Sequence, residues 1–137
     1  MTMFGRNPER LKREFDDAVN AERDRRIAAG FYYGPHKFDW DDATKARVTG
    51  AAASAGFAIG AGAVAGDYRW HGGQTDFGWI LQDNTVLPLD AQGMFQVSQV
   101  AMAHESAHIF AAKAIKEAAV KPADFTDDAH WPAVVPT

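Results

Sequence analysis

The stretch from Asp90 to about Val120 constrains the fold most, because it is the longest run of the chain with an unbroken helical pattern. Apolar residues recur there at intervals of three and four, so they form one stripe along a helix. Asp90 can cap this helix, since its carboxylate accepts hydrogen bonds from free backbone N–H groups, and Pro122 ends the pattern. The stripe consists of Met94, Val97, Ala101, His104, His108, Ala111, Ile115 and Ala118. A long helix with one buried face is therefore expected.

Within this helix, His104, Glu105 and His108 spell the pattern H-E-x-x-H. Two imidazoles one turn apart can hold a zinc ion while the glutamate acts as a base, as in zinc-dependent hydrolases. Such a site needs a third protein ligand. Glu117 lies too far along the axis, at about 1.5 Å per residue, to reach the same ion. The remaining candidates for a third ligand are His71, Asp127, Asp128 and His130.

Two interpretations of the motif follow. In the first, which we adopt, His104 and His108 are packing residues hydrogen-bonded to a carbonyl or a carboxylate. The chain then has no catalytic residue, no metal and no cofactor. In the alternative, His104 and His108 bind zinc, either as a structural ion between subunits or with Glu105 as the base of a hydrolase.

Composition excludes several classes of function. The formal net charge is −4 and the chain has no cysteine, so it has no basic footprint for nucleic acid, no disulfide and no thiolate metal site. The weakly polar run from Val48 to Ala65 is built of Ala and Gly, which makes a poor membrane span. The N-terminus lacks the pattern of a secretory signal, so synthesis in a cytoplasm is expected.

Two further helices are expected in the N-terminal half. Asn7 and Pro8 are suited to start a helix that ends at Gly30. Its charge run, residues 22–26, indicates either a solvated face or a helix packed in an oligomer with ionic flanks. A second helix follows a cap at Asp41 or Asp39, and its many glycines predict that it frays or ends between positions 56 and 62.

The remaining segments predict β-structure and an extended tail. Residues 31–40 place aromatic side chains on both sides of a Gly-Pro breaker, which predicts a short hairpin or an aromatic loop. Segments 67–70, 77–81 and 85–87 suggest three strands in a meander covered by the last helix. The expected fold is α+β, with long helices on a small antiparallel meander. We divide it into an N-terminal charged helix at 1–30, an α+β region at 31–120 and an extended tail at 121–137.

The order of several short patterns resembles an uncharacterised domain family of phage and prophage genomes, found at the C-terminal end of tail-fibre proteins and in neighbouring tail proteins. The likeness spans about residues 20 to 132. The patterns are Ala29-Gly30-Phe31, Phe38-Asp39, Val48-Thr49-Gly50, Trp79 before Asp83-Asn84, His104, Asp124-Phe125-Thr126 and Trp131-Pro132. The resemblance implies a structural or assembly role in a phage tail, with other tail or fibre proteins as partners and the virion as location. It brings no catalytic residue.

The stripe on the last helix and the aromatic residues of the tail motivate a hypothesis of homo-oligomerisation. A trimer is the candidate form, because tail fibres are usually threefold. The residues expected to make protein–protein contacts are Phe125, Trp131, Met94, Val97 and Ile115.

Overall fold

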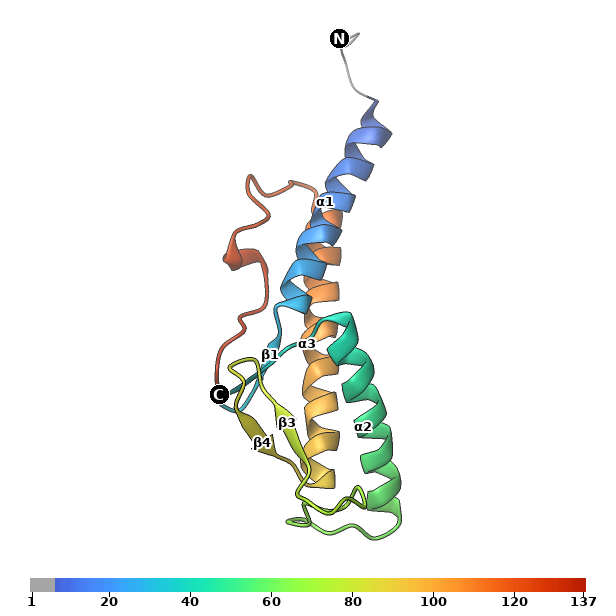
Figure 1. The fold of residues 1–137 in the computed structure, drawn as a ribbon. Helices are drawn as coiled ribbons and strands as arrows, with labels where there is room; N and C mark the ends of the chain where they lie inside the picture. The colour runs from blue at the N-terminus through green and yellow to red at the C-terminus, as the bar shows by residue number, and fades with distance from the viewer. Residues whose placement is uncertain (1–6) are drawn as a thin grey trace.

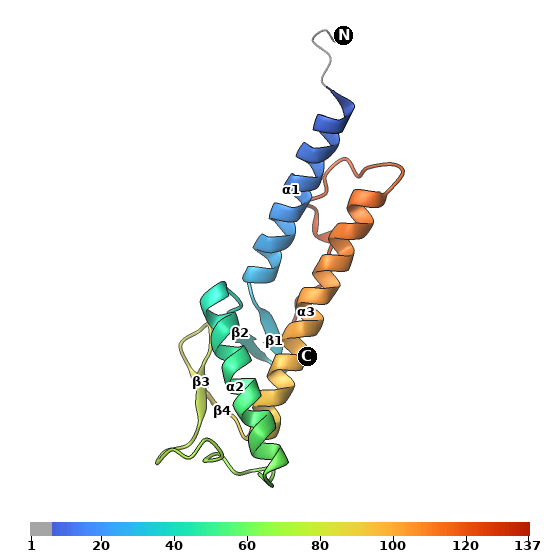
Figure 2. The same ribbon diagram turned by 90° about the vertical axis from the view of Figure 1, so that its right-hand side faces the viewer.

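Three long helices dominate the computed structural model, which describes residues 7–137 (Figure 1). The longest, α3, is the spine of the molecule. Figure 2 shows α1 along the C-terminal part of α3 and extending beyond its end, while α2 lies along the N-terminal part. The predicted N-terminal region, 1–30, begins with residues 1–6, which lie outside the described part. The helices are α1 at Pro8–Ala28, α2 at Asp42–Gly60 and α3 at Ala91–Glu117.

Side-chain caps start all three helices as the sequence predicts. The Asn7 side chain accepts a hydrogen bond from the backbone N–H of Glu9 at 2.8 Å. Asp41, rather than Asp39, caps α2, and Asp90 caps α3 with a 2.7 Å bond from the N–H of Gly93. Each bond satisfies a backbone donor that has no partner within the helix. The expected end of α2 is confirmed as well.

One stripe of α3 forms the core, and this prediction is confirmed. The large cluster around its N-terminal part gathers apolar residues of both α2 and the first hairpin, whereas a smaller one lies between α1, the C-terminal part of α3 and the tail. Ala112 is buried where the pattern placed Ala111. The buried residues of α3 are Ala91, Met94, Val97, Ala101, His104, His108, Ala112 and Ile115.

The strands form two separate antiparallel hairpins among the described residues. The first confirms the predicted aromatic hairpin, with Phe31 opposite Phe38 and their rings stacked at 5.3 Å between centroids. The second packs near the N-terminal end of α3 (Figure 1). The bounds are β1 at Phe31–Tyr33, β2 at His36–Phe38, β3 at Gly78–Ile80 and β4 at Val86–Pro88.

The predicted three-stranded meander is wrong, because residues 67–70 form turns instead of a strand. Gly66 and Gly72 adopt positive φ values of 88° and 83°, which bend the chain on either side of this segment. Trp70 is held by its side chain. Its indole N–H donates to the carbonyl oxygen of Leu89 at 3.0 Å, and its ring lies 4.8 Å from that of Phe77.

The C-terminal tail folds back onto its own chain after α3 ends. It runs beside α1 and returns toward the first hairpin, with a short 3-10 turn, η1, at Asp128–His130 (Figure 1). Trp131 is buried to 6 % exposure, and its indole N–H donates to the carbonyl oxygen of Phe125 at 2.7 Å. The Phe125 ring meets that of Phe15 of α1 edge to face at 5.5 Å. These two aromatic residues therefore anchor the tail on its own domain.

This burial corrects four of the five predicted contact residues. Met94, Val97, Ile115 and Trp131 lie in the cores of the chain itself, at 6 % exposure or less. A side chain buried within one copy has no surface to offer to another. Phe125 is half-buried against α1.

Candidate functional site

His104 and His108 are buried in the α3 stripe and hydrogen-bonded to backbone carbonyl groups. Nε2 of His104 lies 3.0 Å from the carbonyl oxygen of Ile27, and Nδ1 of His108 lies 2.7 Å from that of His104. A carbonyl oxygen only accepts, so each ring nitrogen must be the donor. Burial lowers the pKa of His104 below its ordinary value, against the opposing effect of the bond to Ile27. Both rings therefore lie in the packed core, each with a backbone carbonyl as hydrogen-bond partner.

The hydrogen bond to Ile27 occupies Nε2 of His104, so this nitrogen has no lone pair to offer a metal ion in this conformation. Nε2 of His108 is buried and has no hydrogen-bond partner among residues 7–137. The four candidate third ligands lie elsewhere. Asp127 caps η1, Asp128 pairs with Arg26 at 2.8 Å, and His71 and His130 are exposed. No cluster of three metal-binding side chains occurs in the described part of the chain. Zinc binding stays an alternative that this geometry does not favour.

Glu105, the candidate base, joins α3 to the start of α2. Its carboxylate accepts a hydrogen bond from the Trp40 indole at 2.8 Å and forms an ion pair with Lys45. Burial favours a raised pKa for Glu105, but the hydrogen bonds from Lys45 and Trp40 outweigh it, so the pKa is lowered. This carboxylate has a structural role between the two helices.

The exposed side of α3 carries an apolar stripe of its own. Phe95, Met102 and Ile109 recur every seven residues and are exposed by 40 %, 69 % and 46 %. Phe110 beside them is 65 % exposed. We call Phe95, Met102 and Ile109 the outer stripe. Seven-residue spacing is the pattern of helices that pack along one another.

Charge is sparse around the N-terminal part of the outer stripe. From Ala91 to Ala112 the only charged residue is Glu105, which is already paired. In α2 and the turn after it, no charged residue occurs between Val48 and Gly66, and Phe57 is 82 % exposed. At the other end of the stripe, Ile109 shares a hollow with charged residues of both signs, which are Arg23, Asp24, Asp41, Asp42, Lys45 and Glu105. The ring of Phe95 reaches toward Gly56, so the outer stripe borders α2. The two helices therefore offer solvent a broad surface of apolar and small neutral side chains.

The first helix has the opposite character. Its charge run forms ion pairs, among them Arg26 to Glu22 at 2.7 Å, and Arg26 also binds Asp128 of the tail. Hydrogen bonds from Arg25 lower the pKa of Glu22 to about 2, with Arg26 contributing and burial opposing. Glu22 and Arg26 are almost covered, at 10 % and 13 % side-chain exposure. This network, which spacing alone does not reveal, fastens the tail to α1.

Comparison with known proteins yields one family. Residues 10–131 match the model described as "Domain of unknown function (DUF4376)". No curated protein and no solved structure matches the chain. Within residues 7–137, no helix has the length and apolar character needed to cross a membrane. The matched span takes in α2, α3 and all of α1 except Pro8 and Glu9, and it ends at Trp131, the residue that anchors the tail.

Proposed function

This chain belongs to the DUF4376 family, a domain of unknown function, and we propose that it is a structural or assembly protein of a phage tail or tail fibre. In this proposal it is non-enzymatic and acts through protein–protein contact. Its partners are other tail proteins and further copies of itself, and its location is the virion. The order of sequence patterns that resembles a tail-associated family supports the phage context. The surface of α2 and α3 supports the mode of action.

The outer stripe is the observation that carries the proposal. Burial of apolar surface is favourable by about 25 cal/mol for each square ångström removed from water. Large apolar side chains that stay exposed do not gain this free energy. Single exposed apolar residues are ordinary, but several aligned along one helix face mark an interaction site. Phe95, Met102 and Ile109 form such a line. Because the seven-residue interval suits packing between like helices, a second copy of α3 is the partner we assign to it.

Electrostatics also favour contact between copies. When a surface meets its own copy, any net charge on it meets the same charge and is repelled. Most of the surface around the outer stripe avoids this penalty, because residues 48–66 and 91–112 include one charged side chain, Glu105. The charged residues that gather near Ile109 include both signs. The charged α1 lies away from the N-terminal part of α3 (Figure 2). A threefold assembly around the outer stripe is the candidate form.

Replacing Met102 by glutamate tests this surface. The charge would stand in the middle of the outer stripe, so self-association should weaken about tenfold or more in sedimentation velocity. Arg13→Glu is the matched control, because it places the same side chain at an exposed position of α1. This control should associate as the wild type does. Equal association of Met102→Glu and the wild type would contradict the assignment of the outer stripe.

The phage context needs a separate experiment. Particles purified from a bacterium that produces this chain should contain it, at a few copies per tail, by quantitative mass spectrometry of tail fractions. Detection only in the cell extract, with none in the particles, would contradict location in the virion.

A further inference from the structure

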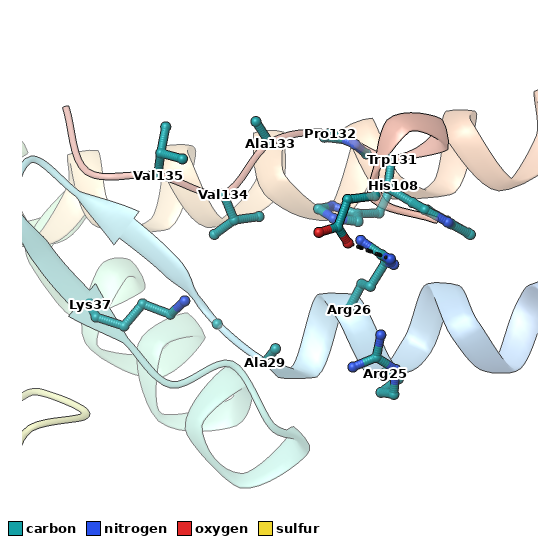
Figure 3. A pocket seen from close by; sticks show the side chains of 12 residues that line it. Arg25, Arg26, Ala29, Lys37, His108, Trp131, Pro132, Ala133, Val134 and Val135 are labelled. Atoms are coloured by element: carbon teal, nitrogen blue, oxygen red, sulfur yellow. Dashed lines mark hydrogen bonds and ion pairs between the residues drawn. The ribbon is translucent and has the colours of Figure 1, made fainter. Parts of the chain in front are cut away.

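A pocket of about 430 Å³ lies between the end of α1, strand β2 and the tail (Figure 3). This volume falls in the range of small-molecule sites in proteins. Tail residues 131–135 form one wall and Ala29 lies on the opposite side, while Gly30 also belongs to the lining. The pocket therefore exists only while the tail is docked. Trp131 and the ion pair between Arg26 and Asp128 hold the tail in this position.

A buried acceptor lines this pocket. His108 is 1 % exposed, and its Nε2 has no hydrogen-bond partner in the described structure. Since Nδ1 carries the hydrogen that it donates to the His104 carbonyl, the neutral ring has its lone pair on Nε2. Buried polar atoms in folded proteins nearly always have a partner, so this nitrogen calls for a donor group.

An unpaired cation lies on another side. Figure 3 shows the Lys37 side chain reaching into the pocket from β2. No carboxylate of residues 7–137 pairs with its ammonium, which lies 4.6 Å from the centre of the Tyr32 ring. The two arginines of the lining, Arg25 and Arg26, are already bound to Glu22. Lys37 is therefore the cation available to a bound anion.

Apolar side chains make up the lining between His108 and Lys37. The Val134 side chain projects toward the pocket interior in Figure 3, and Ala29 and Trp131 complete this part of the lining. A ligand that satisfies both ends carries a negative group for Lys37, a carbon framework beside Val134 and a hydrogen-bond donor for His108.

We propose that this pocket binds a small hydroxylated carboxylic acid, with its carboxylate on Lys37 Nζ and a hydroxyl donating to His108 Nε2. A hydroxyl satisfies the acceptor without adding a charge that would cost desolvation at this depth. Inorganic phosphate suits the pocket less well, because it has no carbon framework to lie beside Val134. The site does not depend on the role of the outer stripe.

Titration of the full chain with glucuronate, followed by ¹H–¹⁵N NMR, tests this proposal. Glucuronate is a ring of suitable size with a carboxylate and several hydroxyls. We expect saturable shifts at the amides of Gly30 and Val134, and a shift of the His108 Nε2 resonance in a long-range ¹H–¹⁵N spectrum. Lys37→Met should weaken binding about fivefold, while Arg13→Met should leave it unchanged.

Matched compounds separate the two contacts. Glucose lacks the carboxylate and cyclohexanecarboxylate lacks the hydroxyls, so each should bind more weakly than glucuronate. Inorganic phosphate, which has no carbon framework, should also bind more weakly than glucuronate. The absence of saturable shifts with glucuronate, equal binding of either matched compound, or unchanged affinity in a folded Lys37→Met variant would overturn the proposal.

Discussion

His104 shows how the surroundings of one residue decide what a motif does. The spacing of H-E-x-x-H is correct for zinc, yet the ring of His104 donates to Ile27, at the end of α1. The bond joins α1 to α3 in the buried core. The same spacing therefore serves helix packing here.

The titration of His104 gives a pH dependence of stability. Its pKa is lowered in the folded state by burial, so the unfolded chain binds the proton more readily. The stabilising contribution is complete above the unfolded pKa of about 6.5 and is lost as the pH falls through the lowered folded value. The urea midpoint should therefore fall between about pH 7 and pH 5.

His104→Gln is the control for this slope. The glutamine amide can donate to Ile27 in place of the imidazole, but it does not titrate. The urea midpoint of the His104→Gln variant should change less over the same pH interval. An identical dependence of the urea midpoint on pH in the variant and the wild type would show that another group is responsible.

The sequence carries enough information for helix caps and for the packing of both histidines, because these depend on neighbours within a few residues. It carries no information about the pocket that His108 lines. That pocket depends on Lys37 and on residues 131–135, which come together with His108 only in the folded chain. A local sequence pattern does not encode contacts between residues that lie far apart in the chain.

Gly30 determines how α1 passes into the first hairpin. It has a φ of 103°, and an added Cβ would lie 2.1 Å from the carbonyl oxygen of Phe38. The sequence predicts a glycine at the end of the helix, which accounts for the positive φ. The close approach of β2 is a tertiary feature that spacing does not show.

Alanine at two glycines separates strain from steric overlap. Gly34 also has a positive φ, at 60°, but nothing lies within 4 Å of an added Cβ. Gly34→Ala should therefore cost about 1 kcal/mol from backbone strain. Gly30→Ala should cost at least about 2 kcal/mol in urea unfolding, because strain and overlap act together. An equal loss of unfolding free energy in the two variants would contradict the close approach of the Phe38 carbonyl oxygen to Gly30.

The tail is the element that sequence reasoning placed least well. Its aromatic residues are recognisable as anchors, but whether they bind their own chain or a neighbour depends on where α1 and α3 lie. The meander failed for a similar reason, since Trp70 is fixed by its side chain rather than by a strand ladder.

Trp131→Ala tests the anchoring of the tail. The residue is 6 % exposed, packs near His108 and lies beneath the guanidinium of Arg26. Its truncation should lower the free energy of unfolding by about 3 kcal/mol. Val135→Ala, at a position 58 % exposed, should change it by less than about 0.5 kcal/mol. Comparable small losses for both would mean that the tail is not anchored by Trp131.

At the scale of the whole molecule, charge is divided between the helices. Ion pairs cover α1, while residues 48–60 of α2 and 91–112 of α3 include only Glu105 as a charged residue. The sequence predicted the α+β fold and the importance of the last helix. It assigned partner contact to the buried stripe, because spacing identifies an apolar face without saying which of two faces the rest of the chain covers.

Sedimentation equilibrium of the wild-type chain at tens of micromolar tests whether the outer stripe joins copies of this protein. We expect a mass that is an integral multiple of the chain mass, three chains for the candidate trimer, and a shift toward one chain in Met102→Glu. A wild-type protein that stays at the mass of one chain throughout this range would contradict it.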